Sequence, residues 1–244
     1  MLELQGVHVE LEGQPVLRDI TLSVKRGEVT GLIGPPESGK TTLFKTMAGL
    51  TESRSGDVRF DGSSMVGLDD DALHAWQGRI GMSFQDDALF DALNVFDNVA
   101  FPLVRRGVAA GEISSQVNER LRQVGLEHAV ARFPSEISGG MRKRVGIARA
   151  MIVNPTLGLF DDPTAGLDPV TSATILEMVV HLARDLNAAT MIVSNDLPVL
   201  FPICDRVVML HEGGVVYDGG VDDIHRAARP EVVQFVTGAH EGPL

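Results

Sequence analysis

The 244-residue chain holds a single cysteine, a single tryptophan and a single tyrosine, and only 5% of its residues are aromatic. One cysteine excludes an intramolecular disulfide framework and any zinc site built from several thiolates, and it favours a reducing compartment. No stretch reaches the roughly 18 consecutive apolar residues that a membrane-spanning helix needs. The opening residues MLELQGVHVE lack the basic and apolar regions of a signal peptide, so we expect none.

Basic residues are also scarce. The chain has 21 Lys and Arg against 33 Asp and Glu, which gives a formal net charge of −12 at pH 7. This balance argues against broad binding to nucleic acid or to an anionic membrane surface, so we expect no nucleic-acid partner and expect any membrane role to run through a partner protein. The length and the 44% hydrophobic content fit one large α/β domain or two small ones tightly joined.

Strand-like and helix-like patterns alternate along the chain. Apolar or alternating runs predict strands at 7–11, 20–24, 28–34, 56–61, 80–84, 156–160 and 189–195. Helical patterns lie at 41–49, 95–135, 139–153 and 169–186, the second with expected breaks at Pro102, Gly107, Gly111, Gly125 and Pro134. A hairpin turning at Gly213-Gly214 and two short helices finish the chain. These elements predict a largely parallel sheet with an antiparallel entrance and an inserted helical subdomain.

A glycine-rich loop separates the strand at 28–34 from the helix after it. The loop matches G-x-x-x-x-G-K-T, with the residues Gly34, Pro35, Pro36, Glu37, Ser38, Gly39, Lys40 and Thr41. In such a loop backbone N–H groups surround phosphate oxygens, Lys40 meets the β- and γ-phosphates, and the Thr41 hydroxyl holds Mg²⁺. The following helix adds its positive N-terminal end, and Thr42 completes the predicted phosphate site.

A second acidic element follows the apolar strand at 156–160. Asp161 and Asp162 end this strand, and an apolar strand that ends in an acid places Asp161 at the carboxyl edge of the sheet beside the glycine-rich loop, where it can bind the magnesium shell. Two acids after a strand are usually a solvated strand end. The presence of the Lys40 loop in the same chain favours the metal-binding interpretation.

With these elements the chain resembles the ATP-binding subunits of ABC transporters over nearly its whole length. Ile137-Ser138-Gly139-Gly140-Met141 resembles the signature motif, Gln85 the Q-loop glutamine, and Ala165-Gly166-Leu167-Asp168 the D-loop. The resemblance implies an α/β P-loop NTPase cassette with a mainly parallel core sheet, an antiparallel β subdomain and an inserted α-helical subdomain. It implies one domain over 1–244, with the helical subdomain and signature at about 95–152 and a C-terminal extension at about 229–244.

The resemblance also implies how such a site works. Two domains pack head to tail, so that ATP and Mg²⁺ on one phosphate loop are closed by the neighbour's Ser138, Gly139, Gly140 and Met141, with the D-loop Asp168 beside them. The implied magnesium ligands are Thr41, Gln85 and Asp161, and the implied catalytic residues are Asp162, Asn195 and Gln85. The implied partners are an integral membrane permease and either a second copy of the chain or a paired ATPase subunit. The chain would then lie peripherally on the cytoplasmic face of the inner membrane.

A narrower resemblance lies in the segment Asp87–Leu103, which contains ALF and then NVFDNVAFPL. This segment, Pro134–Arg144 and the tail Val232–Pro243 are similar to the Mla-type ATPases of phospholipid and other MCE-linked lipid transport. The resemblance implies a phospholipid or related lipid as cargo and, indirectly, a lipid-binding MCE-type component. We expect Phe84 to Pro102 to form the groove for a coupling helix of the permease.

Four departures from the family pattern bear on hydrolysis. Asp162 stands where most members have the Glu that polarises the attacking water, and Asn195 stands where most have His. Leu11 occupies the position of an aromatic residue that stacks on adenine. In the phosphate loop Pro36 lacks an N–H donor, and Glu37 adds a negative charge where the family favours Gly. Together these departures predict a weak ATPase.

Two other functions stay open. The departures favour a regulatory or structural pseudo-ATPase that serves an active sister subunit. A soluble ABC protein of translation or DNA repair is the other alternative, although such proteins usually carry two cassettes or a long coiled-coil insertion, and this sequence has neither. The tail places Val232, Val233 and Val236 on one side of a short helix, and we expect this side to pack on a neighbouring protomer or on the permease.

Overall fold

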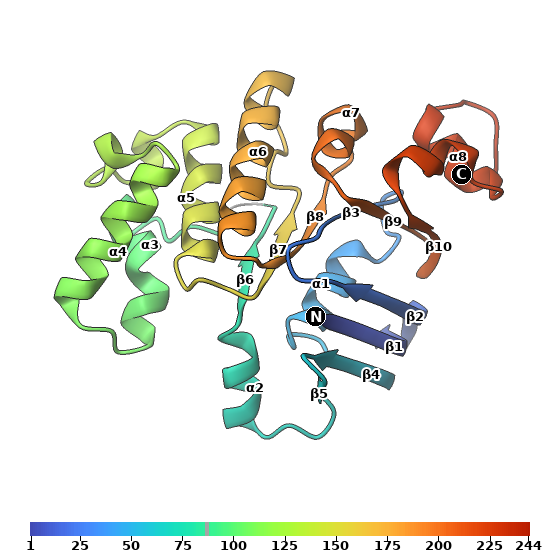
Figure 1. Cartoon of the computed structure of the whole chain (residues 1–244), viewed down its shortest axis with the longest axis horizontal. Helices are drawn as coiled ribbons and strands as arrows, with labels where there is room; N and C mark the ends of the chain where they lie inside the picture. Colours follow the sequence, from blue (N-terminus) through green and yellow to red (C-terminus); the bar gives the residue numbers. More distant parts are fainter. Residues whose placement is uncertain (86–87) are drawn as a thin grey trace.

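Two β-sheets of different kinds organise the chain in the computed structural model, which describes residues 1–85 and 88–244 (Figure 1). One sheet is antiparallel and has the strand order β2-β1-β4-β5. Its strands are β1 (Leu2–Leu11), β2 (Gln14–Val24), β4 (Ser55–Phe60) and β5 (Ser63–Ser64). This sheet corresponds to the antiparallel strands predicted for the N-terminal part of the chain.

The second sheet is mainly parallel and has the strand order β10-β9-β3-β8-β7-β6. Its strands are β3 (Val29–Ile33), β6 (Ile80–Ser83), β7 (Leu157–Asp161), β8 (Ala189–Val193), β9 (Arg206–His211) and β10 (Gly214–Gly219). Every residue of β3, β7 and β8 is buried, as expected for a parallel sheet covered on both faces. The carboxyl ends of β3, β8, β7 and β6 therefore meet at one edge of the sheet.

The β9–β10 hairpin turns one residue earlier than predicted. Its two-residue turn is Glu212-Gly213, with φ of 48° and 77°. A tight turn with positive φ at both positions matches the right-handed twist of the two strands, so the strand geometry selects this pair.

Eight α-helices lie within the described residues: α1 (Lys40–Met47), α2 (Asp70–Gln77), α3 (Val95–Arg105), α4 (Ala110–Gln123), α5 (Gly139–Met151), α6 (Pro169–Asp185), α7 (Leu197–Leu200) and α8 (Pro230–Thr237). Short 3₁₀ segments lie at Glu127–Ala129, Pro134–Glu136, Phe201–Ile203 and Val221–Arg226. None of the helices in residues 1–85 and 88–244 has the length and hydropathy that crossing a membrane requires.

Two of the expected helix breaks are wrong. Helix α3 continues through Pro102, because its apolar face with Val95, Val99 and Leu103 is buried and outweighs one lost backbone hydrogen bond near the helix end. Helix α4 includes Gly111, which lies in its first turn. Gly107, Gly125 and Pro134 do lie outside the α-helices.

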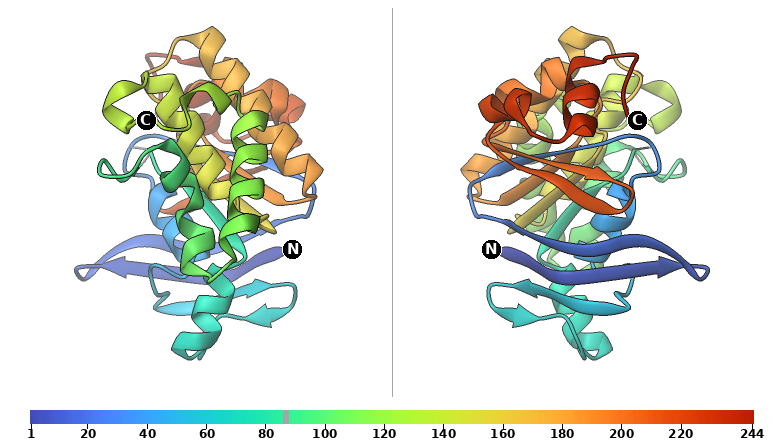
Figure 2. Two further views of the ribbon diagram at one scale, coloured as in Figure 1. Left: turned by 90° about the vertical axis from the view of Figure 1, so that its left-hand side faces the viewer. Right: turned by 90° about the vertical axis from the view of Figure 1, so that its right-hand side faces the viewer.

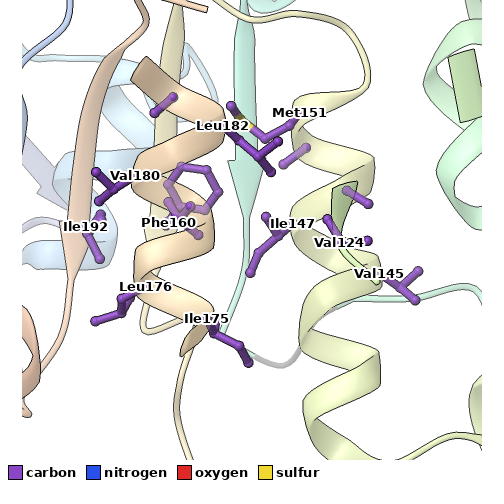
Figure 3. Close-up of a cluster of buried hydrophobic side chains, with 14 of the residues drawn as sticks. Val124, Val145, Ile147, Met151, Phe160, Ile175, Leu176, Val180, Leu182 and Ile192 are labelled. Atoms are coloured by element: carbon purple, nitrogen blue, oxygen red, sulfur yellow. The ribbon is translucent and has the colours of Figure 1, made fainter. Parts of the chain in front are cut away.

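The core sheet separates two hydrophobic clusters. Adjacent residues of one strand point to opposite faces, so Phe160 belongs to the cluster under α5 and α6, while Leu159 belongs to the cluster with α1 and the antiparallel sheet. Figure 3 shows the first cluster, to which α5 contributes Ile147, α6 contributes Ile175 and β7 contributes Phe160. Helix α5 packs against α3 and α4 and also against β6 and β7, so it joins the helical group to the sheet.

The helical group α3–α5 and the C-terminal segment lie at opposite ends of the molecule (Figures 1 and 2). In the tail, Val232 is fully buried in the chain's own core, and Val236 packs against that core. The prediction that this side of α8 needs a neighbouring protomer or a permease is therefore wrong for Val232. The surface that covers α8 comes from Val221–Arg226, which the tail's own pattern does not reveal.

Candidate nucleotide-binding site

The glycine-rich loop lies directly after β3 and leads into α1. At its start Gly34 has φ 146°, and an added Cβ would come within 2.1 Å of the Leu210 carbonyl oxygen. At its end Gly39 has φ 102°, and an added Cβ would lie 2.7 Å from Leu17 Cδ2 of β2. Both φ values favour glycine, and at Gly34 the Leu210 carbonyl also leaves no room for a side chain.

Lys40 is half-buried and folds back over this loop. Its Nζ donates to the carbonyl oxygens of Gly34 at 2.8 Å and Pro35 at 2.7 Å, and it lies 3.3 Å from Ser38 Oγ. Burial lowers the pKa of Lys40, while the negative charges of Asp161 and Asp162 oppose this shift. The Lys40 ammonium is therefore held by oxygen atoms of the loop itself.

Thr41 and Asp161 come from different elements and meet beside Lys40. The Thr41 hydroxyl donates to Asp161 Oδ2 at 2.9 Å, which joins the start of α1 to the end of β7. Asp161 is 6% exposed, and burial raises its pKa, while the Thr41 hydrogen bond and Lys40 oppose the rise. Thr42, next in α1, is half-buried beside this pair in the sequence.

A hydroxyl and a carboxylate are the hard oxygen donors that Mg²⁺ prefers, and Mg²⁺ is usually held by one or two carboxylates together with phosphates and water. Within residues 1–85 and 88–244 no cluster of three or more His, Cys, Asp or Glu forms a protein-only metal cage. The donor set thus fits a magnesium ion bound together with phosphate. Gln85 has an exposed side chain, and no hydrogen bond in the described part of the chain joins its amide to the Thr41–Asp161 pair.

Asp162 follows Asp161 at the carboxyl edge of the sheet. Its backbone N–H donates to the Val193 carbonyl at 3.1 Å, and its φ is 45°. Among residues with a Cβ, Asp and Asn adopt this left-handed region most readily. Burial raises the pKa of the Asp162 carboxyl, the positive charge of Lys143 opposes the rise, and Asp161 adds to it.

Asn195 lies at the same edge, after β8. Val193 of β8 pairs with Asp161 of β7, so Asn195 leaves the sheet beside the two acids. Its side chain is exposed, while the preceding Ser194 is buried and accepts a hydrogen bond from the Asp196 N–H at 3.1 Å. Asn195 is thus exposed at this edge of the sheet, whereas Ser194 before it is buried.

The two other departures, in the phosphate loop and at Leu11, involve three residues that the structure places. Glu37 is exposed and has φ 62°, a conformation that favours glycine, and Pro36 beside it is exposed. Leu11 is 43% exposed and pairs with Gln14 in the β1–β2 hairpin, whose second strand meets the loop at Leu17. All three residues are therefore exposed to solvent.

The signature and D-loop residues lie together in a separate place. Ser138 caps α5 by accepting a hydrogen bond from Met141 N at 3.3 Å, and Asp168 caps α6 by accepting from Val170 N and Thr171 N at 3.0 Å each. An added Cβ on Gly140 would lie 3.4 Å from Thr171 Cγ2, and one on Gly139 3.8 Å from Leu167 Cδ2. No hydrogen bond in residues 1–85 and 88–244 joins this group to the glycine-rich loop.

Sequence reasoning missed Lys143, which lies in α5 and is only 7% exposed. Its Nζ donates to the Gln85 carbonyl oxygen. The basic run of residues 142–144 suggests a solvated helix face. The missed signal is helical spacing, because Lys143 shares a face with Ile147 and Ala150, which are both buried.

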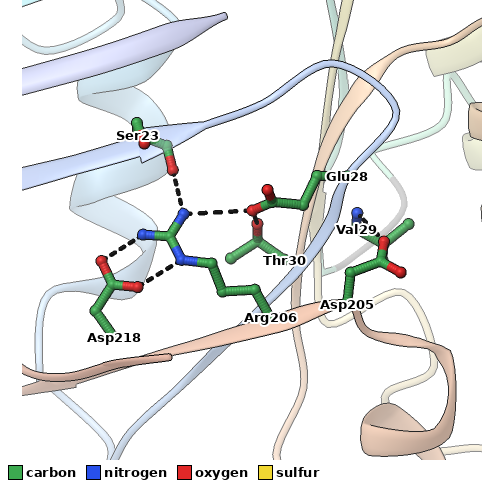
Figure 4. Close-up of polar contacts among 7 residues, drawn as sticks. All are labelled: Ser23, Glu28, Val29, Thr30, Asp205, Arg206 and Asp218. Carbon is green, nitrogen blue, oxygen red and sulfur yellow. Dashed lines mark hydrogen bonds and ion pairs between the residues drawn. The ribbon is translucent and has the colours of Figure 1, made fainter. Parts of the chain in front are cut away.

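A polar network fixes the strand that carries the loop (Figure 4). The Arg206 guanidinium in β9 donates through Nε to Asp218 Oδ1 at 2.5 Å, and through Nη1 to the Ser23 carbonyl at 2.6 Å and to Glu28 at 3.3 Å. The neighbouring Asp205 accepts from Val29 N at 2.8 Å. These contacts tie the β9–β10 hairpin to β2 and to the start of β3.

A buried parallel strand, a G-x-x-x-x-G-K-T loop, a helix N-terminus and an acid on a neighbouring strand together define a P-loop nucleoside triphosphatase. The family model described as "ABC transporter" matches residues 17–165. The chain belongs to the ABC transporter family, as its ATP-binding domain, and the prediction of an ABC-type ATPase is confirmed.

Solved structures confirm the predicted fold class. The chain superposes on cbiO1 from Clostridium perfringens, described as part of the ABC transporter complex cbiONQ, with a TM-score of 0.85 and 29% identity over 98% of this chain and 95% of that one. It superposes on the ATP-binding cassette MJ0796, in a dimeric post-hydrolysis state bound to ADP and Pi, with a TM-score of 0.83 and 29% identity over 91% of this chain and 99% of that one.

Curated relatives point to more than one transport system. The chain is 39% identical over 212 residues to the methionine import ATP-binding protein MetN of Caulobacter vibrioides, which covers 87% of this chain and 64% of that protein. It is 34% identical over 245 residues to the intermembrane phospholipid transport system ATP-binding protein MlaF of Haemophilus influenzae, which covers 100% of this chain and 93% of that protein. The chain thus spans less than two thirds of the methionine relative and nearly all of the phospholipid relative.

Proposed function

We propose that the chain is the ATP-binding subunit of an ABC transporter and couples ATP hydrolysis to transport by a membrane permease. The observation that carries this proposal is the hydrogen bond from Thr41 to Asp161, which brings two magnesium-type oxygen donors beside Lys40. The family membership and the likeness to a cassette bound to ADP and Pi support it.

In this proposal Lys40 exchanges its carbonyl partners for phosphate oxygens, and the N–H groups of Ser38 to Thr42 surround the phosphates. Thr41 and Asp161 hold Mg²⁺, with the Gln85 side chain as a further ligand. The ion, when bound, neutralises charge on the phosphates. Asp162 orients the attacking water.

Asn195 donates a hydrogen bond to the γ-phosphate in this scheme, since an amide can donate but carries no charge and exchanges no proton. Because Ser138, Gly139 and Gly140 lie apart from the phosphate loop, the site is completed by the signature of a second subunit, packed head to tail. The solved dimer of the MJ0796 cassette supports such an arrangement.

We further propose one domain over 1–244, with α3–α5 as a helical subdomain within 95–152 and 229–244 as a C-terminal extension. A cavity of about 500 Å³ lies between this subdomain and β6, lined among others by Phe84, Phe90, Phe101 and Arg106. The rings of Phe90 and Phe101 are 4.6 Å apart, and both side chains are partly exposed. This cavity is the proposed seat of the permease's coupling helix on the cytoplasmic face of the membrane; Asp87, at the start of the related sequence segment, lies outside the described residues.

For the cargo we propose a phospholipid or related lipid, delivered with an MCE-type component. The MlaF match runs through the whole chain, and so does a 34% identical match to the Arabidopsis thaliana protein TRIGALACTOSYLDIACYLGLYCEROL 3, chloroplastic. Methionine import is the second candidate, because several MetN relatives are 37–40% identical.

The test is phosphate release by the chain with its permease in lipid nanodiscs, at saturating ATP and Mg²⁺. We expect ATP-dependent turnover that Lys40→Ala abolishes and that the exposed Lys25→Ala leaves unchanged. Stimulation by phospholipid-loaded MCE protein supports the lipid, and stimulation by a methionine-loaded binding protein supports the second candidate. Tight ATP binding without turnover in the complex would favour the pseudo-ATPase and refute the proposed hydrolysis.

A further inference from the structure

Helix α5 places one lysine inside the protein. Lys143 is 7% exposed and lies on the buried face of α5. A buried ammonium is unfavourable unless hydrogen bonds and negative charge compensate its lost hydration. The Lys143 Nζ donates to the carbonyl oxygen of Gln85, 58 residues away in the sequence, just beyond the end of β6.

Strand register brings Gln85 and Asp162 to the same level. Ser83 of β6 pairs with Phe160 of β7 in the parallel sheet, and each candidate residue lies two positions further along its own strand. Helix α5 packs on both strands. The side chain of Lys143 therefore comes from a helix that packs on both β6 and β7.

The charge of Lys143 also acts on Asp162. Burial disfavours the ionised carboxylate of Asp162, and Lys143 is the leading positive charge that counteracts this effect. The backbone of Asp162 lies in the left-handed region, and its N–H donates to the Val193 carbonyl, which fixes the main chain from which the carboxylate projects. One hydrogen bond to a main-chain carbonyl and one electrostatic attraction to a carboxylate thus involve the same ammonium.

We propose that Lys143 is a positioning residue of the ATPase site, which holds the Gln85 main chain and the Asp162 carboxylate in one arrangement set by helix α5. This inference rests on the proposed function. Helix α5 begins at the signature residues Ser138–Gly140, so the helix that faces a neighbouring subunit's nucleotide also positions the chain's own Gln85 and Asp162. A shift of α5 would therefore change the signature residues that face the neighbour's nucleotide and the positions of Gln85 and Asp162 at the same time.

The test compares three substitutions in the full chain with its permease. Lys143→Met keeps the length of the side chain but removes both donor and charge, and we expect kcat to fall at least tenfold with the KM for ATP within twofold of wild type. Lys143→Gln retains a donor without charge and should recover part of kcat. Lys143→Arg retains both and should recover most of it.

Arg120→Met is the matched control. Arg120 is 9% exposed in α4 and donates to Asn154 Oδ1 at 2.9 Å, so it is a buried cation of the same helical group outside the site. We expect Arg120→Met to lower Tm while kcat per folded molecule stays unchanged. If Lys143→Met loses activity only in proportion to its folded fraction, or if the Gln and Arg variants recover nothing, the proposal is overturned.

A second readout does not need turnover. Amide hydrogen exchange in peptides from β6 to Gln85 should speed up in Lys143→Met and stay at the wild-type rate in Arg120→Met. A wild-type complex that binds but never hydrolyses ATP would refute the proposed function alone. The exchange experiment then decides the role of Lys143, and unchanged exchange in Lys143→Met overturns it.

Discussion

Glu37 combines two unfavourable features in the phosphate loop, and two substitutions separate them. Its φ of 62° lies in the left-handed region, and its exposed carboxylate lies between Pro36 and Ser38, next to the proposed phosphate site. Glu37→Gln removes the charge and keeps the backbone strain. Glu37→Gly removes both.

The expected magnitudes follow from these features. Two like charges near 4 Å repel by about 1 kcal/mol in bulk water, which corresponds to roughly a fivefold change in Kd. We therefore expect Glu37→Gln to tighten ATP binding about fivefold at low salt, with a smaller gain at high salt because exposed charges are screened. A left-handed residue with a Cβ costs about 1 kcal/mol, and the greater freedom of unfolded glycine offsets about half of it. Glu37→Gly should thus add about 0.5 kcal/mol of unfolding free energy as well.

The assay is ATP titration by calorimetry at two salt concentrations, together with urea unfolding of each variant. Asn187→Gly is the control, since Asn187 is also exposed at positive φ (49°) but precedes β8 at the far end of the sheet. It should leave ATP affinity unchanged. An equal Kd for wild type and Glu37→Gln at low salt would show that the carboxylate does not act on the phosphates, and the electrostatic reasoning would be wrong.

Four further outcomes follow from the structure. Asp162→Glu combined with Asn195→His should raise steady-state phosphate release at least tenfold, about 1.4 kcal/mol of barrier, because it restores a longer carboxylate and a protonatable ring; no gain would direct attention to the phosphate loop. Because Leu11 has no aromatic face, ATP and GTP should bind with similar Kd in competition titrations, and a tenfold preference for ATP would reveal another group that reads the base. Val232→Ala should lower the unfolding free energy in urea by about 1–2 kcal/mol, since Val232 is fully buried; an unchanged midpoint would show that the tail helix is not docked. Burial raises the pKa of Cys204 to about 12, so the thiolate is absent near neutral pH and forms only as the pH approaches that value; a thiol reagent should label native protein at pH 8 far more slowly than urea-unfolded protein, and equal rates would contradict the burial.

The sequence by itself determined the features that depend on neighbours in the chain. The glycine-rich loop, the acids at the end of β7 and the capping residues Ser138 and Asp168 all act within a few residues of their own position, so their patterns are legible without a fold. The alternation along the chain of apolar strand patterns with helical patterns was sufficient to predict the α/β fold class. The expectation of slow hydrolysis also comes from the sequence, because it rests on single residues such as Asp162 and Asn195 that differ from the family pattern.

Only the tertiary structure decided which distant residues meet. The strand order brings Thr41 to Asp161 across 120 positions, and helix α5 brings Lys143 to Gln85 across 58. Tertiary packing also buries Val232 within the chain's own core and allows α3 to continue through Pro102. Local patterns predict Asp161 beside the phosphate loop and a buried face around Lys143, but they do not specify which atoms meet. Those contacts depend on the packing of separate elements, and the apolar area that is buried there outweighs local propensity.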